Sequence, residues 1–140
     1  MKWRDIVVNE ALSWLHTPYR YGACMKGRGV DCARLILTCF KKADKIPKGY
    51  EPPHQHRDWI MGKNIDPETF TRCLLLFAKR ISTDLIQKGD VLSFKYIGIE
   101  SHLGIVVDNE NFIHAVTGKC VMIHPIKTFR KKIVAVYRAK

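Results

Sequence analysis

The stretch that decides the fold runs from Thr17 to Phe40 and reads TPYRYGACMKGRGVDCARLILTCF. Its first half carries one proline and several glycines, which interrupt any regular period, so we expect a loop there. Its second half has a helical pattern from Asp31 onward, because Asp is a preferred N-cap residue and the apolar residues after it recur at helical spacing. The sequence therefore predicts a loop that leads into a helix with one buried face.

Cys32 lies in the first turn of this predicted helix. The unpaired backbone N–H groups and the positive end of the helix dipole favour a thiolate over a thiol at this position, and the thiolate is the nucleophilic form. The glycines before Cys32 let a loop approach the sulfur closely. The alternative is that Cys32 is a small apolar residue that begins a core helix, and the helical pattern alone favours neither interpretation.

Two histidines about seventy residues further along, His102 and His114, favour the interpretation of Cys32 as a nucleophile, because such a cysteine needs a histidine as its base. They are twelve residues apart (114 − 102), an even number, so a hairpin can place both on one sheet face. A turn centred on Asp108 would put them directly opposite each other, with Cβ atoms ~5 Å apart. The polar cluster Asp108–Asn111 taken alone would centre the turn later, and that register would separate them.

Five words of the sequence resemble, in order, the signature of the NlpC-type cell-wall peptidases, which are papain-like cysteine enzymes that cleave peptidoglycan stem peptides. These words are TPYRYG at 17–22, GVDC at 29–32, GDVLSF at 89–94, HLGIV at 102–106 and FIHA at 112–115. The thirteen-residue step from Tyr19 to Cys32 and the segment around Trp59 look most like the branch found in tailed phages.

The resemblance implies an α+β, papain-like fold, in which N-terminal helices pack on a roughly five-stranded antiparallel sheet and the nucleophile stands at a helix N-terminus. We expect residues 1–140 to form a single domain. The implied activity is hydrolysis of amide bonds in peptidoglycan stem peptides, of the D-glutamyl–diaminopimelyl type, by a phage- or prophage-derived protein. The implied partners are the stem peptide and phage tail proteins.

The resemblance also assigns roles to residues. Cys32 would form an acyl-enzyme, His102 would act as its base, and His114 would orient the ring of His102, which requires the register centred on Asp108. The backbone N–H of Cys32, together with Tyr19, would stabilise the oxyanion. This chemistry needs no metal ion and no organic cofactor.

The sequence departs from the family pattern directly after the nucleophile. Ala33 and Arg34 stand where two small residues are usual. We assign Arg34 and Ser101 to the substrate cleft as candidates. The bulk of Arg34 also motivates an alternative function, a weakly active or inactive tail-assembly or wall-binding module of the same fold.

The periodicity of the remaining chain predicts helices first and strands afterwards. One helix is expected over Lys2–Leu15, and another begins at Asp66-Pro67. The buried stripe of the second helix is expected to consist of Phe70, Cys73, Leu74, Phe77 and Ile81. His16 and His124 are interpreted as structural. Five strands are expected in an antiparallel meander: Asp90–Phe94, Ser101–Val107, Asn111–Ala115, Lys119–His124 and Ile133–Arg138.

The net charge of +11 suggests a polyanionic partner, but the basic residues are scattered, so no specific nucleic-acid site is predicted. The five cysteines form no Cys-x-x-Cys pair, which indicates neither a disulfide framework nor a zinc ribbon. His54 and His56 with Cys24 or Cys73 have a spacing that fits no common metal site.

Charged residues within the N-terminal apolar region argue against a secretory signal, and no apolar run is long enough for a membrane span. We therefore expect synthesis in the cytoplasm and delivery to the wall as part of a phage tail or a similar particle. The proline-rich loop Asp44–Lys63 has two interpretations of equal weight, one wall of the substrate cleft or a surface excursion.

Overall fold

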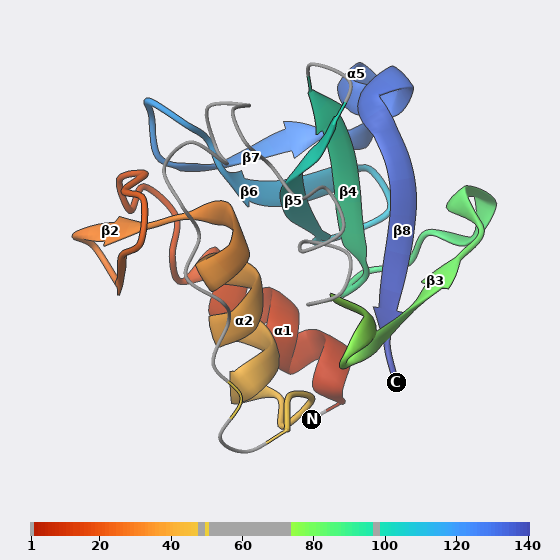
Figure 1. Cartoon of the computed structure of the whole chain (residues 1–140), viewed down its shortest axis with the longest axis horizontal. Coiled ribbons are helices and arrows are strands. Elements are labelled where there is room, and N and C mark those ends of the chain that lie inside the picture. The colour runs from red at the N-terminus through yellow and green to blue at the C-terminus, as the bar shows by residue number, and fades with distance from the viewer. Residues whose placement is uncertain (1, 48–49, 51–73, 97–98) are drawn as a thin grey trace.

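The computed structural model describes residues 2–47, 50, 74–96 and 99–140, without the side chains of residues 96 and 99–101. Helices precede the main sheet in the chain, as predicted (Figure 1). The elements are α1 (Trp3–Leu12), β1 (Cys24–Met25), β2 (Gly29–Val30), α2 (Cys32–Lys42), β3 (Ala78–Ile81), η1 (Thr83–Leu85), β4 (Val91–Tyr96), β5 (Ile99–Val106), β6 (Asn111–Ala115), β7 (Val121–Pro125), α5 (Ile126–Phe129), η2 (Arg130–Lys132) and β8 (Ile133–Ala139).

The main sheet has six antiparallel strands in the order β3-β8-β4-β5-β6-β7. The five predicted strands are all present, and β4 to β7 form the expected meander. The last strand departs from it, because β8 returns to lie between β3 and β4. A two-stranded hairpin of β1 and β2 carries the loop before Cys32.

The prediction of a helix whose buried stripe reaches Ile81 is wrong for the last part of that segment, which forms strand β3. Ala78–Ile81 is extended and pairs with β8, with Ile81 opposite Val136. Pairing with a strand more than fifty residues away outweighs the local helical spacing, which is a weak preference by comparison. Leu74 and Phe77 are buried as predicted, while Phe70 and Cys73 lie outside the described residues.

Helices α1 and α2 pack together on one face of the sheet, where they form the larger core (Figure 1). The sheet contributes Leu103, Ile105 and Ile113 to this core. Alternate residues of the same strands point to the opposite face, where a second cluster includes Phe94, Phe112 and Ile126 of α5, with Phe129 packed against it. The strands next to α2 therefore separate helix-facing residues from those that face α5.

A buried carboxylate links α1 to the sheet through hydrogen bonds. Asp90, directly before β4, is fully buried and accepts hydrogen bonds from Arg4 of α1 and from Arg138 of β8. The backbone N–H of Gln87 donates to the same carboxylate at 2.9 Å. Each carboxylate oxygen thus has charged partners, which is the condition under which burial of an ionised group is tolerated.

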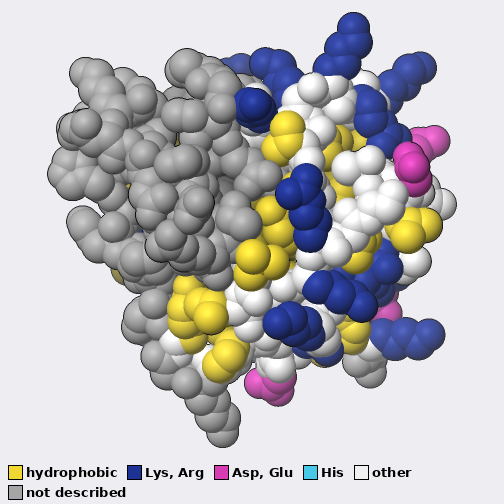
Figure 2. All heavy atoms as spheres, turned by 45° about the vertical axis from the view of Figure 1, so that its right-hand side comes forward, with side chains coloured by type: hydrophobic (Ala, Val, Ile, Leu, Met, Phe, Trp, Pro, Cys, Tyr) yellow, Lys and Arg dark blue, Asp and Glu magenta, His cyan; other side chains and the backbone are white. Residues whose placement is uncertain are grey.

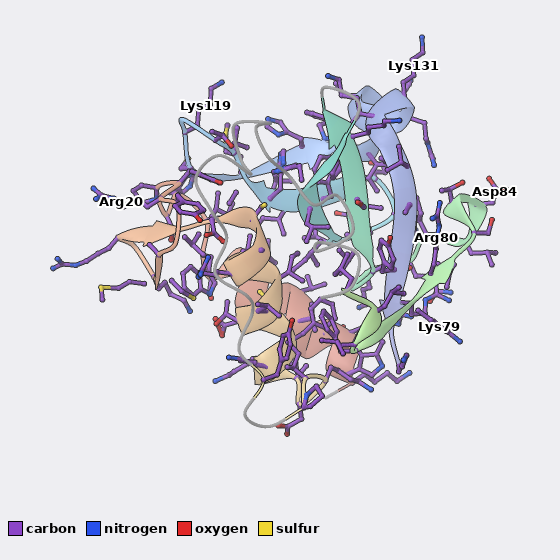
Figure 3. All side chains as sticks on the ribbon, viewed as in Figure 1. Arg20, Lys79, Arg80, Asp84, Lys119 and Lys131 are labelled. Carbon is purple, nitrogen blue, oxygen red and sulfur yellow. The ribbon has the colours of Figure 1, made fainter. Side chains whose placement is uncertain are left out.

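Lysines and arginines are spread over the face shown in Figure 2 instead of gathering in one patch. Lys79, Arg80 and Lys131 project from the side of β3 and β8, and Arg20 and Lys119 project from the opposite side of the molecule (Figure 3). This spread does not test nucleic-acid binding, so the absence of a specific nucleic-acid site stays a prediction. No helix within the described ranges is long and apolar enough to cross a membrane.

Candidate active site

Asp31 ends the loop and begins the helix, as predicted. Its carboxylate accepts from the backbone N–H of Arg34 at 2.9 Å, which is an N-cap bond, and from the backbone N–H of Gly22 at 2.8 Å. Gly22 has φ +76°, a left-handed conformation that favours glycine. One buried side chain thus fixes both the helix terminus and the loop that precedes it.

Arg34 is held by the same carboxylate. Its guanidinium donates to Asp31 Oδ2 at 2.7 Å, and its side chain is only 18% exposed. The cation that departs from the family pattern is therefore a counter-ion to a buried aspartate. Arg34 had been predicted to line the substrate cleft, and in the structure its guanidinium is engaged with Asp31.

Cys32 is the first residue of α2, and only 5% of it is exposed. Burial, together with the negative charge of Asp31, raises the pKa of the Cys32 thiol to about 12. Backbone N–H groups of Leu103, Ala33 and Cys32 itself lower it by a smaller amount. The expectation that the helix N-terminus alone favours a thiolate is wrong for the resting protein, because desolvation outweighs the helix terminus.

The Leu103 hydrogen bond locates the sulfur relative to the histidines. The N–H of Leu103 belongs to the peptide that joins His102 to Leu103, so the sulfur of Cys32 lies next to the backbone at the residue that follows His102. Strands β5 and β6 are paired only at Ile105–Ile113 and Val106–Phe112, so this peptide lies beyond the paired region.

His102 and His114 are joined by a hydrogen bond of 2.7 Å between His102 Nε2 and His114 Nδ1. Their ring centroids are 4.9 Å apart. The register differs from the one predicted, because Ile105 pairs with Ile113 and the turn is centred on Asn109 instead of Asp108. The polar cluster after Val107 sets this turn: Asp108 accepts from the backbone N–H groups of Glu110 and Asn111.

Gly104 explains how the two rings meet in the shifted register. Continuation of the ladder places His114 opposite Gly104, and His102 diagonal to it on the same face. A Cβ at position 104 would lie 2.8 Å from Phe112 Cδ2 and 3.3 Å from the Cβ of His114. The missing side chain leaves the space in which the diagonal contact forms.

A third histidine, which the sequence interpretation had treated as structural, extends this chain. His114 Nε2 and His124 Nδ1 are 2.7 Å apart. His124 lies on β7 opposite Phe112, diagonal to His114 on the same face. The even spacing of ten residues (124 − 114) across the β6–β7 hairpin is the signal that could have revealed it, by the argument already applied to His102 and His114.

Aromatic rings enclose the histidine chain. Phe112 lies 4.5 Å from the His114 ring, centroid to centroid, and Phe94 lies 5.5 Å from the His102 ring. Phe129 packs edge-on against His114 at 5.8 Å. Burial lowers the pKa of His102 to about 4, and burial with the neighbouring histidines lowers the pKa of His114 to about 2. Both rings are therefore neutral at pH 7.

Tyr19 is held between the nucleophile loop and the β6–β7 turn. Its backbone N–H donates to Lys119 O at 3.0 Å, and it forms a parallel bridge with Val30, two residues before Cys32. Burial raises the pKa of the Tyr19 hydroxyl, and the nearby Cys32 and Asp31 raise it further. The hydroxyl also forms a hydrogen bond with the Thr117 side chain, and it stays protonated near Cys32, where it can act as a hydrogen-bond donor.

The remaining predicted residues are less informative. Ser101 precedes His102 on β5, but its side chain is outside the description, as are His54, His56 and Cys73. Cys24 is exposed, whereas Cys39 is buried in the core. Within the described ranges, no group of three or more His, Cys, Asp or Glu side chains is arranged to hold a metal ion. The Asp44–Lys63 loop lies mostly outside the described residues, so both interpretations stand.

Comparison with known proteins decides the family. The model of the NlpC/P60 family matches residues 16–138 of the chain. The chain belongs to the NlpC/P60 family. This NlpC/P60 chain is 32% identical over 112 residues to the probable endopeptidase NlpC of Escherichia coli K12. The aligned region covers 79% of this chain and 60% of that protein.

Two further relatives place this NlpC/P60 chain more broadly. It is 29% identical over 119 residues to the gamma-DL-glutamyl hydrolase of Bacillus subtilis 168, covering 84% of this chain and 24% of that protein. The chain thus spans less than two thirds of the length of either curated relative. The crystal structure of the NlpC/p60 domain of the peptidoglycan hydrolase SagA superposes with a TM-score of 0.67 at 18% identity, over 96% of this chain and 97% of that chain. This likeness confirms the predicted fold, with N-terminal helices on an antiparallel sheet.

Proposed function

We propose that the protein is a cysteine endopeptidase that hydrolyses amide bonds in peptidoglycan stem peptides through an acyl-enzyme on Cys32. The observation that carries the proposal is the hydrogen bond between Cys32 and the backbone N–H of Leu103, which directly follows His102, while His102 is bonded to His114 at 2.7 Å. A nucleophile, a base and a group that orients the base are the three parts that such chemistry needs. The substrate class is supported by the signature words and by a further relative, 25% identical over 118 residues, that is named as the murein DD-endopeptidase MepS/murein LD-carboxypeptidase of Escherichia coli K12.

The reaction begins from a neutral thiol and a neutral imidazole, because burial disfavours charge on both groups. The proton of the Cys32 thiol moves to His102 as the sulfur attacks the carbonyl carbon of the substrate. His102 then returns that proton to the leaving amine, and an acyl-enzyme remains. Water, activated by the same histidine, hydrolyses the thioester and restores the thiol.

Three donors are available for the oxyanion of the tetrahedral intermediate. The backbone N–H groups of Cys32 and Ala33 face the sulfur from the first turn of α2. The Tyr19 hydroxyl, protonated at neutral pH, is the third. Fixed donors in a buried site stabilise developing charge more strongly than water does, because they need no reorganisation.

The bond cleaved and the origin of the protein form the finer part of the proposal. We infer cleavage of a D-glutamyl–diaminopimelyl bond, which is supported by the resemblance of the signature words and by a relative named as a gamma-DL-glutamyl hydrolase. A phage- or prophage-derived origin, with delivery to the wall in a tail, is supported only by the thirteen-residue step from Tyr19 to Cys32 and the segment around Trp59.

The deciding experiment measures soluble peptide fragments released from purified cell wall. Wild type should release them, and Cys32→Ala should not. Cys24→Ala should behave as wild type because Cys24 is exposed and lies on β1, outside the six-stranded sheet that carries the histidines. Mass spectrometry of the fragments identifies the bond. Equal release by wild type and Cys32→Ala would refute the catalytic assignment. Wall binding without release by wild type would favour the wall-binding alternative.

A further inference from the structure

His124 lies at the far end of the histidine chain, where it has no part in the three-residue mechanism above. We propose that His124 is a positioning residue: it accepts the Nε2 proton of His114 and so decides which nitrogen of His102 is left to take the proton of Cys32. The inference deepens the proposed function and rests on it for the role of His102 as base. It is carried by two hydrogen bonds of 2.7 Å in series.

The two hydrogen bonds permit only two proton orders. A neutral imidazole has one N–H donor and one lone-pair acceptor. In the first order, His102 Nε2–H donates to His114 Nδ1, and His114 Nε2–H donates to His124 Nδ1. In the second order every proton is reversed, so that His124 donates to His114, His114 donates to His102, and the proton of His102 is on Nδ1.

Only the first order leaves His102 with an unprotonated ring nitrogen that can accept the proton of the Cys32 thiol. Its Nε2 is occupied by the bond to His114, so Nδ1 is the nitrogen that the thiol proton has to reach. In the first order that proton breaks its bond to sulfur and forms a bond to Nδ1, and the ring becomes a cation whose Nε2–H still donates to His114. In the second order Nδ1 already carries a proton, and the transfer is blocked.

His124 favours the first order because, in the described part of the chain, its Nδ1 is the acceptor within hydrogen-bond distance of His114 Nε2. His114 is only 3% exposed, and its ring packs against Phe112 and Phe129. A buried N–H without an acceptor is costly, whereas an unpaired buried acceptor is tolerated better. Without an acceptor at position 124, His114 would therefore move its proton to Nδ1 and impose the second order on His102.

Two variants separate this role from packing. His124→Leu removes the acceptor, whereas His124→Asn keeps an oxygen near the position of Nδ1, the atom that His114 contacts. His16→Asn is the control, because His16 is exposed and asparagine tolerates its φ of +71°. ¹⁵N NMR of the imidazoles reports which nitrogen is protonated, and alkylation of Cys32, followed by peptide mapping, reports access to the base without any wall substrate.

Wild type, His124→Asn and His16→Asn should show Nε2–H on both His102 and His114. His124→Leu should shift the proton of both rings toward Nδ1 and slow alkylation of Cys32 at pH 7 about tenfold to a hundredfold, as for other residues that orient a functional histidine through its second nitrogen.

A wild-type His102 with its proton on Nδ1, or a His124→Leu protein with wild-type tautomers and alkylation rate, would overturn the inference. His124→Asn behaving like His124→Leu would also overturn it, since an acceptor would then not suffice. If His124→Leu fails to fold, the wild-type tautomers and the rate of His124→Asn still decide. Failure of the proposed function appears separately, as a wild type that releases nothing from cell wall while these differences persist.

Discussion

His114 lies opposite Gly104 in the antiparallel ladder, and it reaches His102 along the diagonal of the sheet. The contact therefore depends on a residue that has no side chain. Three positions on two strands act together: in the proposed mechanism His102 supplies the base and His114 orients it, and Gly104 leaves the space between them. This relationship makes Gly104 as testable as the histidines themselves.

Gly104→Ala should reduce both stability and wall hydrolysis. The new Cβ would approach Phe112 and Ile113 O within 2.8 and 3.2 Å, so the neighbouring strand has to shift, at a cost of about 1–3 kcal/mol. Gly27→Ala is the control: its φ of +80° imposes a backbone cost of about 1 kcal/mol in open space, far from the histidines in the chain. If both variants lose activity only in proportion to unfolding, the steric argument for Gly104 is wrong.

Substitutions at His114 should rank Asn above Gln and Gln above Ala in rate. His114 contacts His102 through Nδ1, and the side-chain oxygen of asparagine lies near that position, whereas that of glutamine reaches further. Adding His114→Ala to His102→Ala should cost almost nothing more, because members of one catalytic unit are not additive. Single-turnover kinetics on the four single variants and the double variant would measure this. Full activity of His114→Ala would remove it from the mechanism.

Removing the negative charge of Asp31 and removing the positive charge of Arg34 should change the reactivity of Cys32 in opposite directions. Asp31 raises the pKa of Cys32, and Arg34 compensates that charge. Arg34→Gln should therefore slow alkylation of Cys32 at pH 8, and Asp31→Asn, which keeps an N-cap acceptor, should accelerate it, each by up to about tenfold. Asp84→Asn, an exposed site on η1, serves as the control. Changes of the same sign in Asp31→Asn and Arg34→Gln would rule out an electrostatic cause.

Acid should destabilise the fold through the histidines. The folded-state pKa values of His102 and His114, about 4 and 2, lie below the value of about 6.5 expected in the unfolded chain. The unfolded chain thus binds more protons, and stability falls as pH drops from 6.5 toward 4, by about 1.4 kcal/mol per pH unit for each histidine. Urea unfolding between pH 7 and 4.5 should show this slope, which His114→Asn should reduce and His16→Asn should not. An unchanged slope in His114→Asn would contradict the assigned burial.

The sequence by itself determined the parts of the site that local physics controls. Asp31 is a helix N-cap and Cys32 begins the helix because capping and apolar spacing are properties of neighbouring residues. Equal parity allowed His102 and His114 to share one face, because strand side chains alternate and an odd number of residues lies between the last paired residues of the two strands. The five signature words indicated the family that the comparison confirmed.

Only the tertiary structure decided what depends on distant pairing. The ladder centred on Asn109 made Gly104 the partner of His114, and the next hairpin brought in His124. Residues 78–81 form strand β3 because they pair with β8, although the spacing of their apolar residues is helical. The pKa of Cys32 was set by desolvation, which depends on everything packed around the sulfur and not on the helix that carries it.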